Sequence, residues 1–123
     1  MATIIDPLGT PSVVYNLSGT VLIDMNAAGT DASTGAQIPN VCGHAIVVVT
    51  YIDGSNHAVV MPSGNDVGDI IEVFGTFVFN NTIGVFPASG ETFGTVSQVD
   101  IRNDRGCRFI KTSNTSWRFI GGT

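Results

Sequence analysis

The chain has 123 residues, 43% of them apolar and only 12% charged, with a formal net charge of −5. This composition excludes an intrinsically disordered chain, because disorder requires low hydrophobicity and high net charge. Residues 1–101 carry nine acidic residues and no Lys or Arg, which argues against nucleic-acid binding, since phosphate neutralisation supplies most of that affinity.

The first eleven residues are predicted to form an extended arm in front of a single all-β domain, residues 12–123. Thr3, Ile4 and Ile5 favour an extended conformation, whereas two prolines, at positions 7 and 11, prevent continuation into a core strand. The segment lacks the positive start and the long apolar stretch of a signal peptide. We expect Thr3, Ile4, Ile5 and Pro7 to order on contact with a partner; a frayed terminus is the alternative.

Short runs rich in Val, Ile, Phe and Thr, separated by Gly, Asn, Asp and Pro, recur along the rest of the chain. Helical periodicity is almost absent, so the pattern predicts an antiparallel β-sandwich or barrel, possibly a jelly roll, with under about a tenth of the residues helical. The expected strands are Ser12–Asn16, Thr20–Met25, His44–Ile52, His57–Met61, Asp69–Phe74, Thr76–Asn80, Ile83–Phe86, Val96–Ile101, Cys107–Lys111 and Ser116–Ile120.

Two hairpins and one long loop organise these strands. The dipeptide Asp53-Gly54 predicts that Ala45–Met61 is a hairpin. The polar turn Lys111–Ser116 makes Cys107–Ile120 a second hairpin. Asn26–Asn40 is the longest stretch without a strand pattern, and we expect either a flexible surface loop or an ordered contact loop.

The run Ala45–Ile52 does not alternate between apolar and polar residues, so both faces of its strand would be apolar. A strand in a two-layer antiparallel domain normally has one solvated face. Either this strand is central in a closed barrel, or one of its faces meets another subunit. Phe77 and Phe79 raise the same question, and Ile46, Val48, Phe77 and Phe79 are therefore the candidate subunit-interface residues.

The residues that could carry chemistry form no catalytic or metal-binding signature. Cys42 and His44 are two residues apart and would share a strand face, but a cysteine nucleophile needs a base positioned by a third group. Their spacing matches no zinc finger. A solvated turn is preferred to a divalent cation at Asp66 and Asp69. We expect no enzyme activity, no cofactor and no metal, and no stretch is long and apolar enough for a transmembrane helix.

Cys42 and Cys107 are 65 positions apart, and without a secretory signal we expect two buried free thiols instead of a disulfide. Trp117 is the only tryptophan. We expect it to be a core residue of the last hairpin; a sugar-stacking platform or an interface anchor is the alternative.

A series of landmarks between residues 57 and 121 resembles bacteriophage structural proteins, namely capsid decoration (cement) proteins and head- or tail-fibre domains. An apolar-Pro pair, Met61-Pro62, ends one strand, and Gly68-Asp69 introduces the next. A Pro-x-x-Gly-Glu turn follows at 87–91, and a closing hairpin carries Trp117 near the C-terminus.

The resemblance implies a homotrimer at the three-fold positions of an icosahedral shell, without a catalytic role. The partners would be the chain itself and the major capsid protein, with the arm contacting the capsid. The protein would be made in the host bacterial cytoplasm and reside on the capsid surface of the virion. The alternative is a receptor- or carbohydrate-binding module of a tail fibre or baseplate, which would need an exposed aromatic platform at Tyr15, Tyr51 or Trp117.

Overall fold

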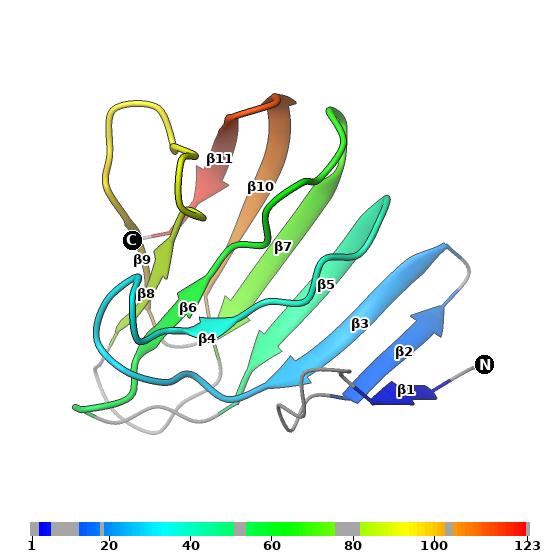
Figure 1. The fold of residues 1–123 in the computed structure, drawn as a ribbon. Helices are drawn as coiled ribbons and strands as arrows, with labels where there is room; N and C mark the ends of the chain where they lie inside the picture. Colours follow the sequence, from blue (N-terminus) through cyan, green and yellow to red (C-terminus); the bar gives the residue numbers. More distant parts are fainter. Residues whose placement is uncertain are drawn as a thin grey trace.

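The computed structural model describes residues 3–5, 13–17, 19–50, 54–75, 82–102 and 105–122. Every regular element within these ranges is a β-strand (Figure 1), as the sequence predicted. The strands are β1 (Thr3–Ile5), β2 (Val13–Leu17), β3 (Thr20–Met25), β4 (Ala36–Gln37), β5 (His44–Val49), β6 (Ala58–Val60), β7 (Ile70–Gly75), β8 (Thr82–Phe86), β9 (Val99–Arg102), β10 (Gly106–Ser113) and β11 (Ser116–Gly121).

The strands form two mixed sheets that face each other. The larger sheet has seven strands in the order β1-β2-β3-β5-β7-β10-β11, and the smaller sheet has four in the order β4-β6-β8-β9. Neither sheet closes into a barrel, so the closed-barrel expectation is wrong and the layered arrangement is compatible with a sandwich. The expectation of purely antiparallel strands is also wrong, because the central ladders of both sheets are parallel.

From β3 to β8 the chain alternates between the two sheets. As a result β3, β5 and β7 pair in parallel in the larger sheet, and β4, β6 and β8 pair in parallel in the smaller one. The predicted hairpin over Ala45–Met61 is therefore wrong, since β5 and β6 belong to different sheets. A turn dipeptide specifies a change of direction but not which strand the chain pairs with afterwards.

Antiparallel strands extend both ends of the larger sheet. At one end of the larger sheet, β10 pairs with β7 and β11 pairs with β10. The β10–β11 pair confirms the predicted hairpin over Cys107–Ile120. At the other end β1 pairs with β2, and β2 pairs with β3. The segment predicted to be a contact arm is thus the edge strand of its own sheet, while its contact with a partner stays a prediction. Pro7 and the predicted strand Thr76–Asn80 lie outside the described residues.

The core lies between the two sheets and contains the inward-facing residues of both. Because successive side chains of a strand point to opposite faces, every second residue of β5 and β7 enters it. Trp117 is fully buried and packs in this cluster, so the prediction of a core tryptophan is confirmed. The stretch 26–40 contributes the buried Ala27 and Ile38 and includes β4, and it is therefore packed against the core.

Candidate functional site: the outer face of the larger sheet

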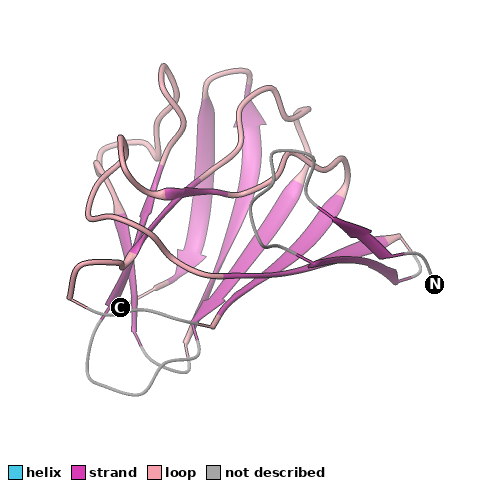
Figure 2. Ribbon diagram, turned by 60° about the horizontal axis from the view of Figure 1, so that its bottom comes forward, coloured by secondary structure: helices cyan, strands magenta, loops and turns pink. Residues whose placement is uncertain are grey.

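The larger sheet has an outer face that the smaller sheet does not cover. The smaller sheet lies on one side of the larger sheet, and no described strand lies on the other side (Figures 1 and 2). The cross-strand register of β3, β5, β7, β10 and β11 arranges the outward residues in three rows. The first row is Thr20, His44, Ile70, Ile110 and Arg118; the second is Leu22, Ile46, Glu72, Arg108 and Ile120; the third is Asp24, Val48, Phe74 and Gly106.

Half of the residues on the outer face are large and apolar. They occur there because several strands carry two adjacent apolar residues, one for each side of the sheet. In Ile70-Ile71 the second residue is 1% exposed in the core and the first is half-buried on the outer face. In Phe119-Ile120 the second residue is 71% exposed. A contiguous apolar surface on a sheet is typical of an interaction site.

Phe74 covers the sheet closely because the neighbouring position on β10 has no side chain. A Cβ atom built on Gly106 would lie 2.5 Å from the Phe74 ring. The ring therefore rests directly over the glycine backbone, on the outer face, and is 39% exposed. This packing makes that corner of the outer face flat and apolar.

A row of hydrogen bonds runs across the centre of the outer face. The Thr20 Oγ1 lies 3.1 Å from Nδ1 of His44, whose Nε2 lies 2.6 Å from Oε2 of Glu72. The guanidinium of Arg108 donates to Oε1 of Glu72, with both Nη2 and Nε at 3.2 Å. Because a carboxylate only accepts hydrogen bonds, Nε2 of His44 carries a proton in its contact with Glu72.

These contacts set the charge state of Glu72. Burial disfavours the ionised carboxylate, but the hydrogen bonds from His44 and Arg108 and their charges outweigh it and lower the pKa of Glu72. The carboxylate is thus paired within the chain. A partner could cover this part of the outer face without leaving Glu72 as an unpaired buried charge, which would be costly.

The structure brings together two of the four predicted interface residues. Ile46 and Val48 occupy adjacent rows at the centre of the outer face, on β5. Phe77 and Phe79 lie outside the described residues, and Thr3–Ile5 form the far edge of the same sheet. Sequence reasoning missed Leu22, Ile70, Phe74, Ile110 and Ile120. The adjacent apolar pairs were the available signal, because they predict strands with two apolar sides.

The cysteines and acids considered for chemistry lie in the described part of the chain, and the acids have structural contacts there. Cys42 and Cys107 are both free, which confirms that they form no disulfide; Cys107 is buried as expected, but Cys42 is exposed, contrary to prediction. Burial raises the pKa of the Cys107 thiol to about 11. The Asp69 carboxylate accepts hydrogen bonds from the backbone N–H groups of Gly43 and Asp66, each at 3.0 Å, which closes the 66–69 turn. Across the described ranges, no group of three or more His, Cys, Asp or Glu side chains could hold a metal ion.

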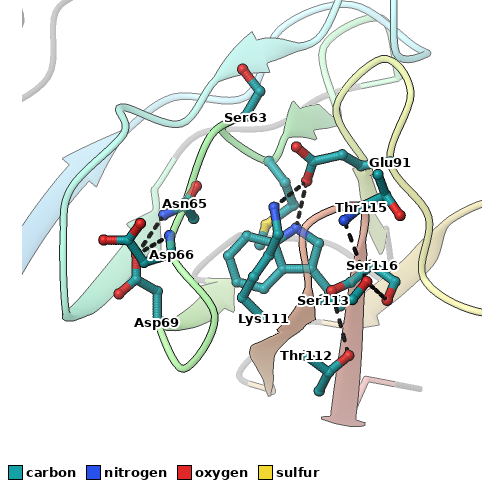
Figure 3. Close-up of polar contacts among 12 residues, drawn as sticks. Ser63, Asn65, Asp66, Asp69, Glu91, Lys111, Thr112, Ser113, Thr115 and Ser116 are labelled. Carbon is teal, nitrogen blue, oxygen red and sulfur yellow. Dashed lines mark hydrogen bonds and ion pairs between the residues drawn. The ribbon is translucent and has the colours of Figure 1, made fainter.

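A second polar cluster lies in the interior, where Lys111, Glu91 and Trp117 meet (Figure 3). The Lys111 Nζ donates to Oε1 of Glu91 at 2.8 Å, and the indole Nε1 of Trp117 donates to the same oxygen at 3.0 Å. The Lys111 Nζ also lies 5.1 Å from the centre of the Trp117 ring. The cluster joins the 87–91 turn to the last hairpin.

Comparison of the chain with protein-family models, with curated proteins and with solved structures found no match. Within the part of the chain that the structure describes, no helix is long and apolar enough to cross a membrane.

Proposed function

We propose that the chain is a non-enzymatic structural protein of a bacteriophage virion, a capsid decoration protein that binds the outside of the assembled shell as a homotrimer and stabilises it. The observation that carries this proposal is the outer face of the larger sheet, half of whose residues are large and apolar and whose central charges are paired within the chain. Such a surface suits a subunit that spends its functional life in contact with other subunits.

The absence of a sequence signature for catalysis agrees with the polar contacts of the described residues. The hydrogen bonds of His44 go to Thr20 and Glu72, and those of Glu91 go to Lys111 and Trp117. Each set has a structural explanation, on the outer face or in the core. A structural role in an assembly accounts for both sets without invoking a substrate.

The buried Trp117 favours capsid decoration over receptor or carbohydrate binding. A sugar-binding module needs an aromatic ring open to solvent, and this ring is fully buried under Lys111. Tyr51 lies outside the described residues. The alternative thus loses Trp117, the side chain of Tyr15 is not described, and the described aromatic ring open to solvent on the outer face is Phe74.

The edge strand β1 offers a means of attachment to the shell. It pairs with β2 on one side and is the last strand of the larger sheet, and no other described strand pairs with its second edge. Edge strands of this kind pair readily with an extended segment of another protein. We propose that Thr3–Ile5 adds to a strand of the major capsid protein, and that three copies multiply this contact through avidity.

The proposal is tested on virions produced without this chain. Purified protein added to such particles is expected to bind the capsid saturably, in multiples of three, and to raise the temperature at which the shells release DNA. Deletion of residues 2–10 should increase the dissociation rate from the shell. Binding confined to the tail, or no binding to the particles, would contradict a decoration role.

A further inference from the structure

The outer face carries opposite charges on its two sides. On β3 the exposed charged residue is Asp24, whereas β11 presents Arg118 and β10 presents Arg108, whose charge is already paired with Glu72. The same asymmetry holds for the whole chain: residues 1–101 have a net charge of −9, and residues 102–123 have five bases and one acid, for a net charge of +4. The larger sheet thus runs from an acidic side to a basic side.

We infer that the outer face is a contact between copies of this chain, in which the β3 side of one copy lies on the β10–β11 side of the next. This inference rests on the proposed function, because it specifies how the subunits of the proposed oligomer meet. The occupant is a second copy because the face is complementary to itself: its acidic side matches its own basic side, with apolar residues and the internally paired Glu72 between them.

The charges decide how the two faces are oriented. A contact that matched like sides would place Arg118 near Arg118, or Asp24 near Asp24, and both arrangements are repulsive. Matching unlike sides places Asp24 of one copy near the basic β11 strand of the other. If both sides meet the same neighbour, the contact is a two-fold one between two copies; if each copy uses one side toward each of two neighbours, it generates a closed ring such as the proposed trimer.

The apolar residues supply the attraction, and the paired charges allow the face to lose its water. Ile46 and Val48 lie between the two charged sides and would form the centre of the contact. Glu72 is already bonded to His44 and Arg108 in its own chain, so burying it requires no partner from the second copy. The charged groups at the sides then select the orientation.

The first experiment places a charge at the centre of the outer face. The mass of purified Ile46→Glu is measured by light scattering at micromolar concentration beside the wild type. We expect an oligomer for the wild type and a monomer for Ile46→Glu. The matched control is Val67→Glu, because Val67 is 60% exposed and lies in the 66–69 turn, away from the outer face. It should keep the wild-type mass.

The second experiment exchanges the charges at the two sides. Asp24→Arg and Arg118→Asp should each weaken self-association by about tenfold at low salt. The double variant Asp24→Arg/Arg118→Asp should restore it, because acid and base again face each other. Both positions are exposed, so these variants test the contact even if Ile46→Glu fails to fold, which circular dichroism and a urea titration would reveal.

A monomeric wild type, or a folded Ile46→Glu that retains the oligomeric mass, would overturn the inference. Single charge reversals whose effects simply add in the double variant would overturn the acid-to-base orientation. Self-association that appears only when shells are added would assign the face to the capsid instead of a second copy. The proposed function is judged separately. Binding to particles can fail while self-association persists, and self-association can fail while binding to particles persists.

Discussion

Removing the Glu91 carboxylate is predicted to destabilise the fold by about 3–5 kcal/mol, because it leaves a buried ammonium group without its partner. The side chain of Lys111 is 0% exposed and that of Glu91 is 8% exposed, and their charged atoms are 2.8 Å apart. Neither group can be solvated in place. The variant Glu91→Ala therefore tests how strongly the interior depends on this ion pair.

The magnitude follows from two contributions. The unpaired Lys111 ammonium accounts for most of it. The indole N–H of Trp117 loses the same acceptor oxygen, and an unsatisfied buried donor costs about 1–3 kcal/mol. The contact of Lys111 with the Trp117 ring, at 5.1 Å, is present before and after the change and does not enter the difference. With an unfolding entropy of about 2.1 cal/mol/K per residue, a loss of about 4 kcal/mol lowers Tm by about 15 °C.

The assay is urea unfolding, followed by circular dichroism and by the fluorescence of the only tryptophan. The companion variant is Lys111→Met/Glu91→Gln, which removes both charges, keeps an unbranched side chain at 111 and leaves an amide oxygen for the indole N–H. We expect the double variant to be more stable than Glu91→Ala. Asp66→Ala, at an exposed position, is the control and should change the free energy of unfolding by less than about 0.5 kcal/mol.

Two results would refute this reasoning. A cost below about 1 kcal/mol for Glu91→Ala would mean that water or a rearranged side chain compensates Lys111. A Lys111→Met/Glu91→Gln variant whose loss equals the sum of the losses of Lys111→Met and Glu91→Gln, each measured alone, would mean that the charges do not interact, since a close ion pair must give a non-additive cycle.

Three further changes test other parts of the structure. Gly106→Ala should cost about 1–3 kcal/mol in urea unfolding, because its Cβ would lie 2.5 Å from the aromatic ring above it; Gly54→Ala, which meets no atom within 4 Å, should be near neutral. In the native protein iodoacetamide should label Cys42 alone, whereas unfolding in denaturant should expose Cys107 as well; two rapid native adducts would show that the second thiol is accessible. The lowered pKa of Glu72 stabilises the fold above its ordinary value of 4.5 and loses that effect as the pH falls through the folded value; Glu72→Gln should therefore flatten the acid limb of a stability–pH curve, and an unchanged limb would contradict the assignment.

The sequence predicted the existence of most strands but not the way they pair. Runs such as Ile70–Gly75 and Ser116–Gly121 are recognisable because their composition and flanking turns are local properties. The parallel ladders were missed because their partners are far apart: β3, β5 and β7 begin at residues 20, 44 and 70. Strands that recur at a regular spacing are typical of a fold in which the chain returns to the same sheet once per repeat. These three strands share no repeated residue pattern, so the sequence did not reveal the parallel pairing.

The candidate site was predictable only where it depended on a single strand. Ile46 and Val48 were found because their own run lacks alternation. The bond between Glu72 and Arg108 depends on the pairing of β7 with β10, and the bond between Glu91 and Lys111 depends on the packing of a turn against a hairpin. In both cases the partners are brought together by register and topology, which the spacing of residues along the chain does not determine.

The inward and the outward apolar residues of β5 and β7 have different roles. The inward residues of β5 and β7 complete the core by themselves, so Ile46 and Ile70 on the outer face add little to the stability of an isolated chain. Thr at those positions would also favour a strand, and a charged residue would resist aggregation better. Half-buried in the isolated chain, Ile46 and Ile70 would contribute more if another surface covered them. Because the charges at the centre of the face are paired internally, the orientation of that surface must come from the acidic and basic groups at its sides.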